Sequence, residues 1–499
     1  MRELLRYLVE NETAGNSDRL RSFNIAIDVF GRDAEFDGNN DSIVRVEAAR
    51  LRRMLAAYYA EHPESPLQIS IPKGRYVPVY EARKDISHRP LHQPVGGPGI
   101  AVLPFTPTTS ADDNRVLAEG LTAELRFQLS RFAEFRVVDA SSMSDTPAPQ
   151  LLTQIANHLE CQYLVKGRIT STSGGIRISV EAIDTLNAHV VWTQRMEVKE
   201  NDTSLLETEE QIATSIARAL APVPGSLIVN GFERGDRAPQ DWDAIDCVFR
   251  WHYYRVHSRS KETYDALVTA LKNLLEKHAN FSLGWAMLGY MTIDAWIFRM
   301  QPGSCFENLA RSARVYAGRA LTLAPRNSPA HYVLGLCDYF GGNYQGFRQH
   351  FLDALQLNPN SLDLLHNGGA LLAFGGNWRE GCNCVADADL SYSNSMGLRF
   401  FYVVEALRNG DIEKANELLS VVEPHGGWYW CSLLRAVIAE QRDQPEEASA
   451  SLNSAFTMCE ELANPSPNQL EIEVKKWFGD PKIQDLLINS FRRIRQASY

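Results

Sequence analysis

Six basic side chains in the first part of the chain could bind phosphate. They are Arg45, Arg50, Arg52, Arg53, Lys73 and Arg75. A guanidinium presents its N–H donors in a planar fork that matches phosphate oxygens, and an ammonium acts as a compact point charge. The cluster therefore predicts contact with a nucleic-acid backbone. A solvated amphipathic helix would show similar charge spacing, so contact with a protein stays open as the alternative.

A helix and a hairpin must position these side chains. Asp41 or Ser42 can cap a helix, and apolar residues then recur at helical spacing. These residues are Ile43, Val46, Ala49, Leu51, Leu55 and Tyr58. We expect the arginines on the opposite face. Alternation over 67–71, a turn at Lys73-Gly74 and a return strand over 75–79 predict a hairpin.

This layout resembles the C-terminal part of OmpR/CadC-type winged-helix DNA-binding domains. The residues that carry the resemblance are VRVEAARLRRML and ISIPKGRYVPVY. The resemblance implies that Arg45, Arg50, Arg52 and Arg53 face DNA from a recognition helix. It also implies that Lys73 and Arg75 reach phosphate from the wing. We expect this winged-helix-like domain over residues 1–84, followed by a Pro- and Gly-rich linker over 85–99.

Residues 100–225 predict an α/β domain. The expected order is strand 100–105, helix 116–132, strand 135–138, helix 150–159, strands 163–170, 176–183 and 189–198, and helix 205–220. The stretches IAVLPF, LAEGLTAELRFQLSRFAEFRVV and YLVKGRITSTSGGIRISVEAIDTLNAHVVWTQRMEV, with the closing helix, resemble the N-terminal domain of TolB and its FlgO-like relatives. The sequence leaves open whether this domain binds a ligand, and we treat its role as architectural by default.

The second half of the chain repeats a short turn at a fixed interval. Gly342-Asn343, Gly376-Asn377, Gly410-Asp411 and Gln444-Pro445 each begin 34 residues after the one before. This is the period of a tetratricopeptide (TPR) helix–turn–helix repeat. Residues 239–462 therefore resemble a TPR solenoid whose groove binds a protein or peptide, with a bare structural spacer as the alternative. Residues 463–499 resemble the capping helices of such arrays.

Composition and missing motifs narrow the possible functions. The net charge of −11 argues against a generally basic nucleic-acid binder, although one domain could still bind locally. No phosphate-binding loop, nucleophile elbow or HExxH motif occurs, so we expect no enzyme activity, cofactor or metal. Eight scattered cysteines and the lack of a secretory or membrane-spanning run favour a cytoplasmic protein with no membrane contact.

The predicted fold class is multidomain α+β, with a winged-helix-like domain, a TolB-like α/β domain and an all-α TPR solenoid. Bacterial regulators that combine these parts form a group often labelled adenylate cyclase-related, and the chain resembles them. We expect a transcriptional regulator that contacts double-stranded DNA and binds a partner through the TPR array. The alternative is a signalling scaffold that does not bind DNA. Cyclase activity is a third hypothesis, although we find no domain to carry it. The sequence leaves the oligomeric state open.

Overall fold

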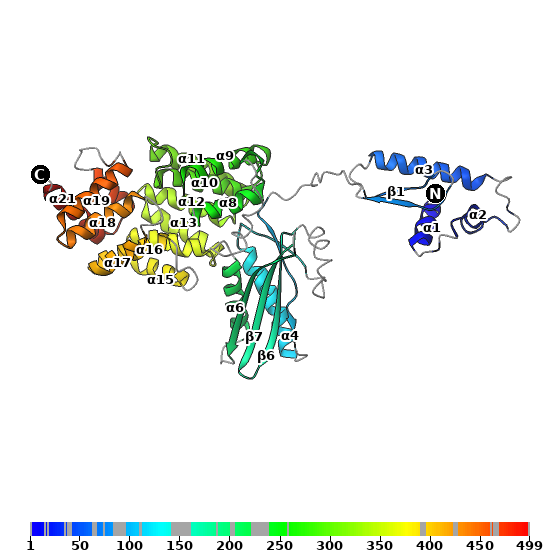
Figure 1. The fold of residues 1–499 in the computed structure, drawn as a ribbon, viewed down its shortest axis with the longest axis horizontal. Coiled ribbons are helices and arrows are strands. Elements are labelled where there is room, and N and C mark those ends of the chain that lie inside the picture. Colours follow the sequence, from blue (N-terminus) through cyan, green and yellow to red (C-terminus); the bar gives the residue numbers. More distant parts are fainter. Residues whose placement is uncertain are drawn as a thin grey trace. The chain divides into compact units, whose positions relative to one another are not determined.

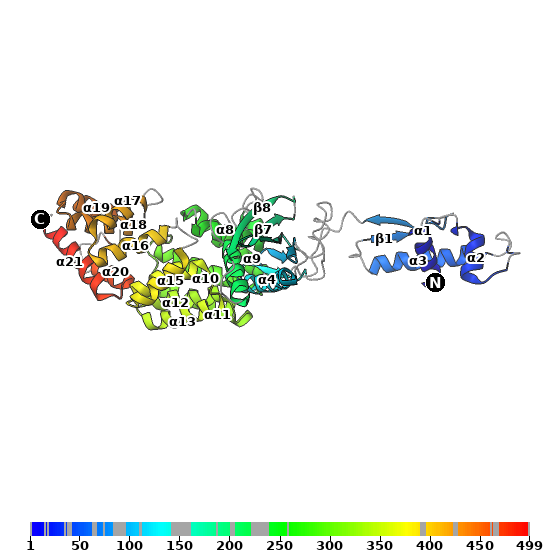
Figure 2. The ribbon, with the colours of Figure 1, turned by 90° about the horizontal axis from the view of Figure 1, so that it is seen from below.

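The computed structural model describes most of the chain and forms two compact units, residues 1–94 and 95–499 (Figures 1 and 2). This division is coarser than the five segments expected from the sequence, which stay predictions. The described residues are 2–13, 16, 19–33, 36, 42–61, 67–72, 75–82, 96–108, 112–140, 161–185, 188–199, 205–220, 239–256, 259–389, 396–422, 428–459, 462 and 469–497. Lys73, most of the 85–99 linker and the helix expected over 150–159 lie outside them.

The first unit packs three helices and a strand pair around a small apolar core. The helices are α1 (Arg2–Thr13), α2 (Ser22–Phe30) and α3 (Ile43–Glu61), and the strands are β1 (Leu67–Ser70) and β2 (Val79–Ala82). The core consists of Leu4, Leu8, Leu20, Ile25, Ala26, Val44, Leu51 and Ile71. Tyr7 fastens α1 to α2, because its hydroxyl donates a 2.6 Å hydrogen bond to Asp28 Oδ2.

The buried face of α3 differs from the expected one. Val44, Ala48 and Leu51 are buried, at spacings of four and three residues. Val46 and Tyr58, which we expected to face the core, are 55% and 51% exposed. Several overlapping stripes of α3 are apolar enough to serve as the core face, so the packing against α1, α2 and Ile71 selects among them.

The hairpin is also displaced from its expected position. β1 and β2 pair antiparallel with Ser70 opposite Val79, so the return strand begins at Val79 and not at Arg75. Pro72 and Pro78 lie in the connection between the strands. Proline cannot donate a backbone hydrogen bond, which disfavours ladder pairing over this stretch.

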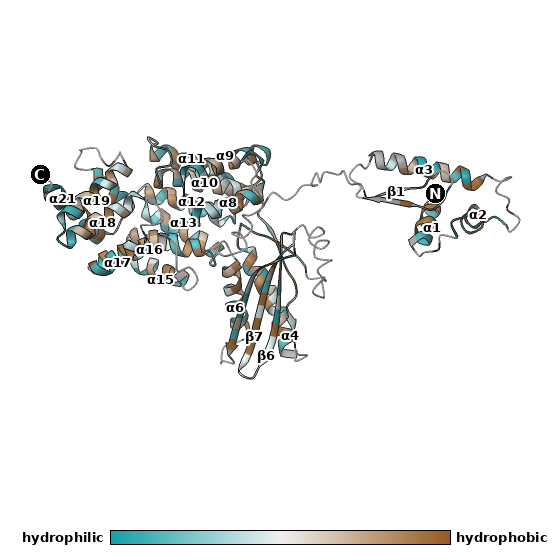
Figure 3. Ribbon diagram, viewed as in Figure 1, coloured by the Kyte–Doolittle hydropathy of each residue, from teal (hydrophilic) through white to brown (hydrophobic). Residues whose placement is uncertain are grey.

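The second unit begins with a mixed sheet whose spatial order is β5-β3-β6-β7-β8, with β4 beside β6. β3 pairs parallel with β5 and β6, whereas β6, β7 and β8 form an antiparallel meander. The strands are β3 (Gly99–Val102), β4 (Thr106–Pro107), β5 (Arg136–Val138), β6 (Tyr163–Thr172), β7 (Gly175–Asp184) and β8 (Val190–Lys199). Figure 3 shows hydrophobic and hydrophilic stretches alternating along β6 and β7, as the period of two in a strand requires.

Helices α4 (Asp112–Ser130) and α6 (Leu205–Leu220) pack on the same face of this sheet. Leu117, Leu121, Leu125 and Leu129 of α4 share one buried cluster with Ile100 and Val102 of β3. The alternate residues Ala101 and Leu103 belong to a separate cluster. Gly167 of β6 permits this packing, because a Cβ added there would lie 2.0 Å from the Phe105 ring.

The rest of the unit is a succession of antiparallel helix pairs, seen in Figure 1 as the colours pass from green through yellow to red. The elements are η3 (Pro239–Asp241), α8 (Ala244–Val256), α9 (Lys261–Lys277), α10 (Ser282–Ile297), α11 (Phe306–Leu323), α12 (Ser328–Phe340), α13 (Tyr344–Leu357), the π-helical turn η4 (Leu364–Gly368), α14 (Gly369–Phe374), α15 (Trp378–Asp389), α16 (Met396–Asn409), α17 (Ile412–Val422), α18 (Tyr429–Gln441), α19 (Pro445–Met458), α20 (Gln469–Trp477) and α21 (Pro481–Ala497). The fold is thus a mixed sheet followed by a helical array.

The repeated turns have a common backbone geometry. Gly342, Gly376 and Gly410 have φ of +82°, +107° and +82°, and Asp443 has +59°. Glycine adopts this left-handed region without steric cost, so it ends a helix and turns the chain. Asn343 then caps α13, since its side chain accepts a 3.0 Å hydrogen bond from Gly346 N. The interval read from the sequence therefore marks real helix ends.

Among the described helices, none has the length and apolar character that crossing a membrane requires.

Candidate nucleic-acid interface

The outward face of α3 carries two parallel rows of side chains. One row contains Arg45, Ala49 and Arg53, all exposed. The neighbouring row alternates apolar and basic residues: Val46, Arg50 and Met54, of which Met54 is 50% exposed. Residues four apart lie one above another on a helix, so the two rows form one continuous surface of three arginines and two apolar side chains.

Arg52 takes a different position from the other three arginines. Its Nε donates a 2.7 Å hydrogen bond to the carbonyl of Ile71. Its Nη2 donates to the carbonyls of Pro72 at 2.9 Å and Arg75 at 3.2 Å. The guanidinium therefore clamps α3 to the connection after β1. Its role in the structure is to hold helix and hairpin together.

The clamp also determines where the hairpin's own basic residue lies. The side chain of Arg75 is exposed, and its backbone carbonyl is one of the three that Arg52 binds. The other basic residue expected at this tip, Lys73, lies outside the described residues. Arg50 is 61% exposed at its side chain and lies 3.9 Å from Glu47, so part of its charge is compensated locally. The structure therefore brings Arg45, Arg50 and Arg53 together on one face and leaves Arg75 on the adjoining hairpin.

Such a surface can bind phosphate and also contact base edges. Arginine forks pair with phosphate oxygens, and apolar side chains contact the methyl group of thymine in the major groove. The same combination of arginine and exposed apolar groups also suits a protein interface. The geometry is compatible with both interpretations that the sequence left open.

The helical array is the second candidate surface, and a C-terminal segment of the chain lies against it. Tyr339 Oη donates a 2.6 Å hydrogen bond to the carbonyl of Trp477, and Tyr344 Oη donates one of 2.8 Å to that of Lys475. The amides of Gly479 and Asp480 both donate to the carbonyl of Phe374. This segment, which we call the C-terminal strap (residues 469–480), thus contacts several repeats rather than extending only the last one.

Glu473 anchors the strap from its buried side. Its Oε1 accepts hydrogen bonds from Tyr429 Oη at 2.6 Å and Trp477 Nε1 at 3.1 Å. Arg299 Nη2 lies 3.4 Å from both carboxylate oxygens. The ring centres of Trp428 and Trp430 lie 5.3 Å and 5.6 Å from that of Trp477. Any partner of the array must bind elsewhere or replace the strap.

Buried charges gather where α8 meets α10 and the start of the η4 helix. Arg255 forms an ion pair with Asp363, and its side chain is only 7% exposed. Burial raises the pKa of Asp294 to about 6, although Arg259 and Arg255 partly oppose the rise. The cost of burying the ionised carboxylate exceeds the attraction of the two arginines, so Asp294 takes up a proton more readily than an exposed carboxyl.

His252 and Glu134 form a contact between the array and the sheet domain. His252 Nε2 lies 4.0 Å from Glu134 Oε1, and both side chains are buried. Burial raises the pKa of Glu134 and lowers that of His252. Both shifts favour the neutral forms, so this pair is better described as a polar packing contact than as an ion pair. Asn360 Nδ2 donates a 2.6 Å hydrogen bond to Gln128 Oε1 at the same junction.

Sequence reasoning missed the buried charges, although a signal was present. Arg250 and Arg255 stand in a helix rich in tryptophan and tyrosine, where a charged residue needs a partner or a ring face. The structure supplies both kinds of contact. Arg255 lies 4.6 Å from the ring centre of Trp251, and Arg250 lies 4.0 Å from that of Trp242. The carboxylate that pairs with Arg255 is distant in sequence, so no local pattern could identify it.

Comparisons with known proteins match parts of the chain. Residues 98–215 match the family model described as HilA/YgeH-like transcriptional regulator, second domain. This match suggests a regulatory role. A protein of Rhizobium meliloti (strain 1021), provisionally named adenylate cyclase 3, is 22% identical over 254 residues, which is 50% of this chain and 42% of that protein. The chain thus spans less than half the length of this relative.

Solved structures resemble about a quarter of the chain. TolB from Acinetobacter baumannii is 18% identical over 26% of this chain and 29% of its own, with a TM-score of 0.20. The PelC dodecamer from Paraburkholderia phytofirmans is 19% identical over 24% of this chain and 86% of its own, with a TM-score of 0.19. These scores are too low to establish a shared fold.

Proposed function

We propose that this chain is a cytoplasmic transcriptional regulator. Its first unit, a winged-helix-like module, contacts double-stranded DNA, and its TPR-type array binds a protein or peptide. The observation that carries the proposal is the outward face of α3, where Arg45, Arg50 and Arg53 are exposed together. The match of residues 98–215 to a transcriptional regulator domain supports it. We assign Arg52 to holding the hairpin and the other three arginines to DNA.

Arg45 and Arg53 supply the phosphate contacts in this proposal, and Arg50 belongs to the row with Val46 and Met54, which would face the bases. Each phosphate contact releases counterions, so the logarithm of the affinity falls linearly with that of the salt concentration, by about 0.9 per contact. Arg75 and, as expected from the sequence, Lys73 add contacts from the hairpin. The partner bound by the array changes how the first unit engages DNA.

The test is fluorescence anisotropy of the full chain with random-sequence duplex DNA across a salt series. We expect Arg45→Ala/Arg53→Ala to weaken binding and to reduce the salt slope by about 2. The matched control is Arg311→Ala/Arg319→Ala, which removes the same charge from exposed positions on α11 and leaves the slope unchanged. Absence of binding at the lowest salt would contradict the proposal.

A second candidate is a protein–protein scaffold that does not bind DNA. It is favoured by the exposure of Val46 and Met54 beside the three arginines of α3, since arginine and methionine are enriched in protein–protein interfaces. Capture of a protein partner that is lost in Val46→Ser/Met54→Ser, with no DNA co-purifying, would favour the scaffold.

The proposed activity is regulatory and not enzymatic, in spite of the cyclase name of the relative. Cyclase chemistry requires two metal-binding aspartates beside a purine site. Incubation of the purified chain with ATP and a divalent metal tests this point directly. Accumulation of a cyclic nucleotide would overturn it.

A further inference from the structure

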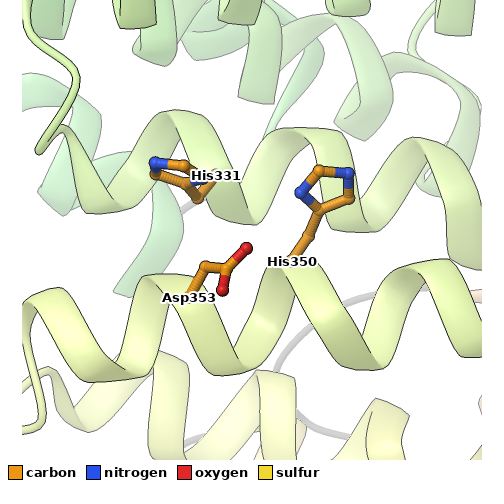
Figure 4. Close-up of side chains that lie close together, drawn as sticks. All are labelled: His331, His350 and Asp353. Carbon is orange, nitrogen blue, oxygen red and sulfur yellow. The ribbon is translucent and has the colours of Figure 1, made fainter.

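Three potential metal ligands meet between α12 and α13. His331 lies on α12, and His350 and Asp353 lie on α13. Their ligand atoms, one from each residue, all lie within 4.8 Å of one another. Figure 4 shows the carboxylate of Asp353 directed toward the space between the two imidazole rings. All three side chains are half-buried.

The packing of the two helices explains this convergence. His350 and Asp353 are three residues apart, so they share one face of α13. Gly335 lies one turn after His331 on α12, and a Cβ added there would lie 3.2 Å from the Phe347 ring and 3.3 Å from His350 Cβ. The missing side chain lets α13 approach closely. His350 is thereby brought against the face of α12 that carries His331.

The Nε2 atom of each histidine lies near an oxygen atom of a residue outside the cluster. His331 Nε2 lies 3.1 Å from the carbonyl of Pro325, so it carries the proton and donates. His350 Nε2 lies 3.7 Å from Asp338 Oδ2, which is longer than a direct hydrogen bond, and this carboxylate can accept from Nε2 after a small rotation of the ring. A proton on Nε2 leaves Nδ1 of each ring with its lone pair. Each Nδ1 is buried and makes no hydrogen bond with any residue that the structure describes.

The carboxylates around the cluster are oriented in the same way. Asp353 Oδ1 accepts a 3.0 Å hydrogen bond from Gln349 Nε2, which leaves Oδ2 for another contact. Asp338 is fixed by Arg314, whose Nη2 donates a 2.7 Å hydrogen bond to its Oδ1. Metal-binding histidines in proteins are oriented by a carbonyl or carboxylate on their other nitrogen. Pro325 and Asp338 occupy these supporting positions.

We propose that His331, His350 and Asp353 form a site for a divalent transition metal of the Zn²⁺ class. The ligands are Nδ1 of each histidine and a carboxylate oxygen of Asp353. Imidazole nitrogen favours zinc and its neighbours over Mg²⁺ and Ca²⁺, which prefer all-oxygen surroundings. Zinc–ligand bonds of about 2.0–2.1 Å bring tetrahedral ligands closer than the present spacing, so the side chains close in by small rotations. Three protein ligands leave a fourth position for water or a partner's side chain.

A metal bound here would join α12 to α13 within one helix pair. Binding to the folded state alone stabilises that state in proportion to the logarithm of the metal concentration over Kd. The array would therefore gain stability from the metal in a region that is remote in sequence from the DNA-binding candidates. The site is independent of the proposed regulatory function.

The test uses the full chain, stripped of metal with a chelator and then titrated with Zn²⁺. We expect one Zn²⁺ per chain by elemental analysis after gel filtration, with a rise in Tm. His331→Ala/His350→Ala should weaken the affinity at least about 100-fold and abolish the rise in Tm, and Asp338→Asn should weaken it about 10-fold. Circular dichroism of the metal-free variants checks that they fold. If His331→Ala/His350→Ala does not fold, Asp353→Asn, which preserves the side-chain shape, replaces it.

Two controls separate this site from other binding. His278→Ala removes an exposed histidine outside the cluster, and Cys382→Ser/Cys384→Ser removes two half-buried thiols. Both should retain full binding. Co²⁺ provides an independent readout, since thiolate ligands would add charge-transfer absorption in the near ultraviolet and the proposed ligands would not. Equal Zn²⁺ content in wild type and ligand variants, binding that depends on the two cysteines, or no binding by wild type would each overturn the proposal.

Discussion

The arginines on the outer face of α3 and the buried Arg255 of the helical array occupy opposite environments. On α3, Arg45, Arg50 and Arg53 are exposed, and Arg50 lies 3.9 Å from Glu47. In the array, Arg255 is buried against Asp363 and packs on the rings of Trp251 and Tyr290. The same type of side chain is thus open to solvent on α3 and fixed by internal contacts at Arg255.

The difference separates function from stability. An exposed guanidinium contributes little to folding stability, because water competes for its hydrogen bonds. It therefore stays available to bind a phosphate. A buried one has already paid its desolvation cost, so losing its partner leaves an uncompensated charge. Arg52 lies between these extremes. It belongs to the same helix as the exposed arginines, but its N–H groups donate hydrogen bonds within the fold.

Asp363→Ala should produce the largest effect. It leaves the Arg255 guanidinium buried without its carboxylate, and we expect a loss of about 3 kcal/mol in the free energy of unfolding. That is the lower end of the range for such pairs, because Asp363 is 29% exposed. Urea unfolding followed by tryptophan fluorescence measures it, since all nine tryptophans lie in the second unit. Glu47→Ala, whose partner Arg50 is 61% exposed, should change the stability of the first unit by less than about 1 kcal/mol. Hydrogen exchange of α3 peptides measures this change, because the first unit has no tryptophan. Equal effects would erase the contrast.

Arg52→Ala and Arg53→Ala form a matched pair on one helix. Losing the hydrogen bonds of Arg52 to three carbonyls should cost about 2 kcal/mol, whereas loss of Arg53 should cost less than about 0.5 kcal/mol. Hydrogen exchange of α3 peptides in the full chain measures this, and about 30-fold faster exchange is expected for Arg52→Ala alone. Similar exchange in both variants would refute the clamp. A fall in DNA affinity for Arg53→Ala without faster exchange would strengthen the assignment of roles.

The smallest expected effect concerns the pH dependence of Asp294. Its pKa is about 6 in the folded chain against an ordinary value of 3.8, so the folded state takes up a proton first as the pH falls. Wild type should therefore gain about 1 kcal/mol in the free energy of unfolding relative to Asp294→Asn between pH 7 and pH 5. The groups facing it are Arg259, Arg255, Tyr254 and Asp363, which both proteins share. Urea unfolding of both proteins at the two pH values provides the difference, and a gap independent of pH would show that Asp294 titrates normally.

Local pattern predicted much of the backbone. The expected helix over 205–220 coincides with α6 (Leu205–Leu220), and the turns at Gly342, Gly376 and Gly410 lie where glycine has positive φ. Both depend on residues close in the chain, namely apolar spacing and a residue free to turn left-handed. The displaced hairpin shows the limit of such reasoning, because a return strand was expected from Arg75 and yet β2 begins at Val79.

The sequence by itself determined the order of elements, the repeat interval and the identity of the basic residues, since these depend on neighbours within a few turns. Tertiary structure alone decided which arginine clamps and which faces outward. It also decided that the strap residue Glu473 meets Tyr429, and that His331 approaches His350 across two helices. The physical reason is that burial, pairing and ligand geometry depend on atoms brought together from distant positions, and no local period records that approach.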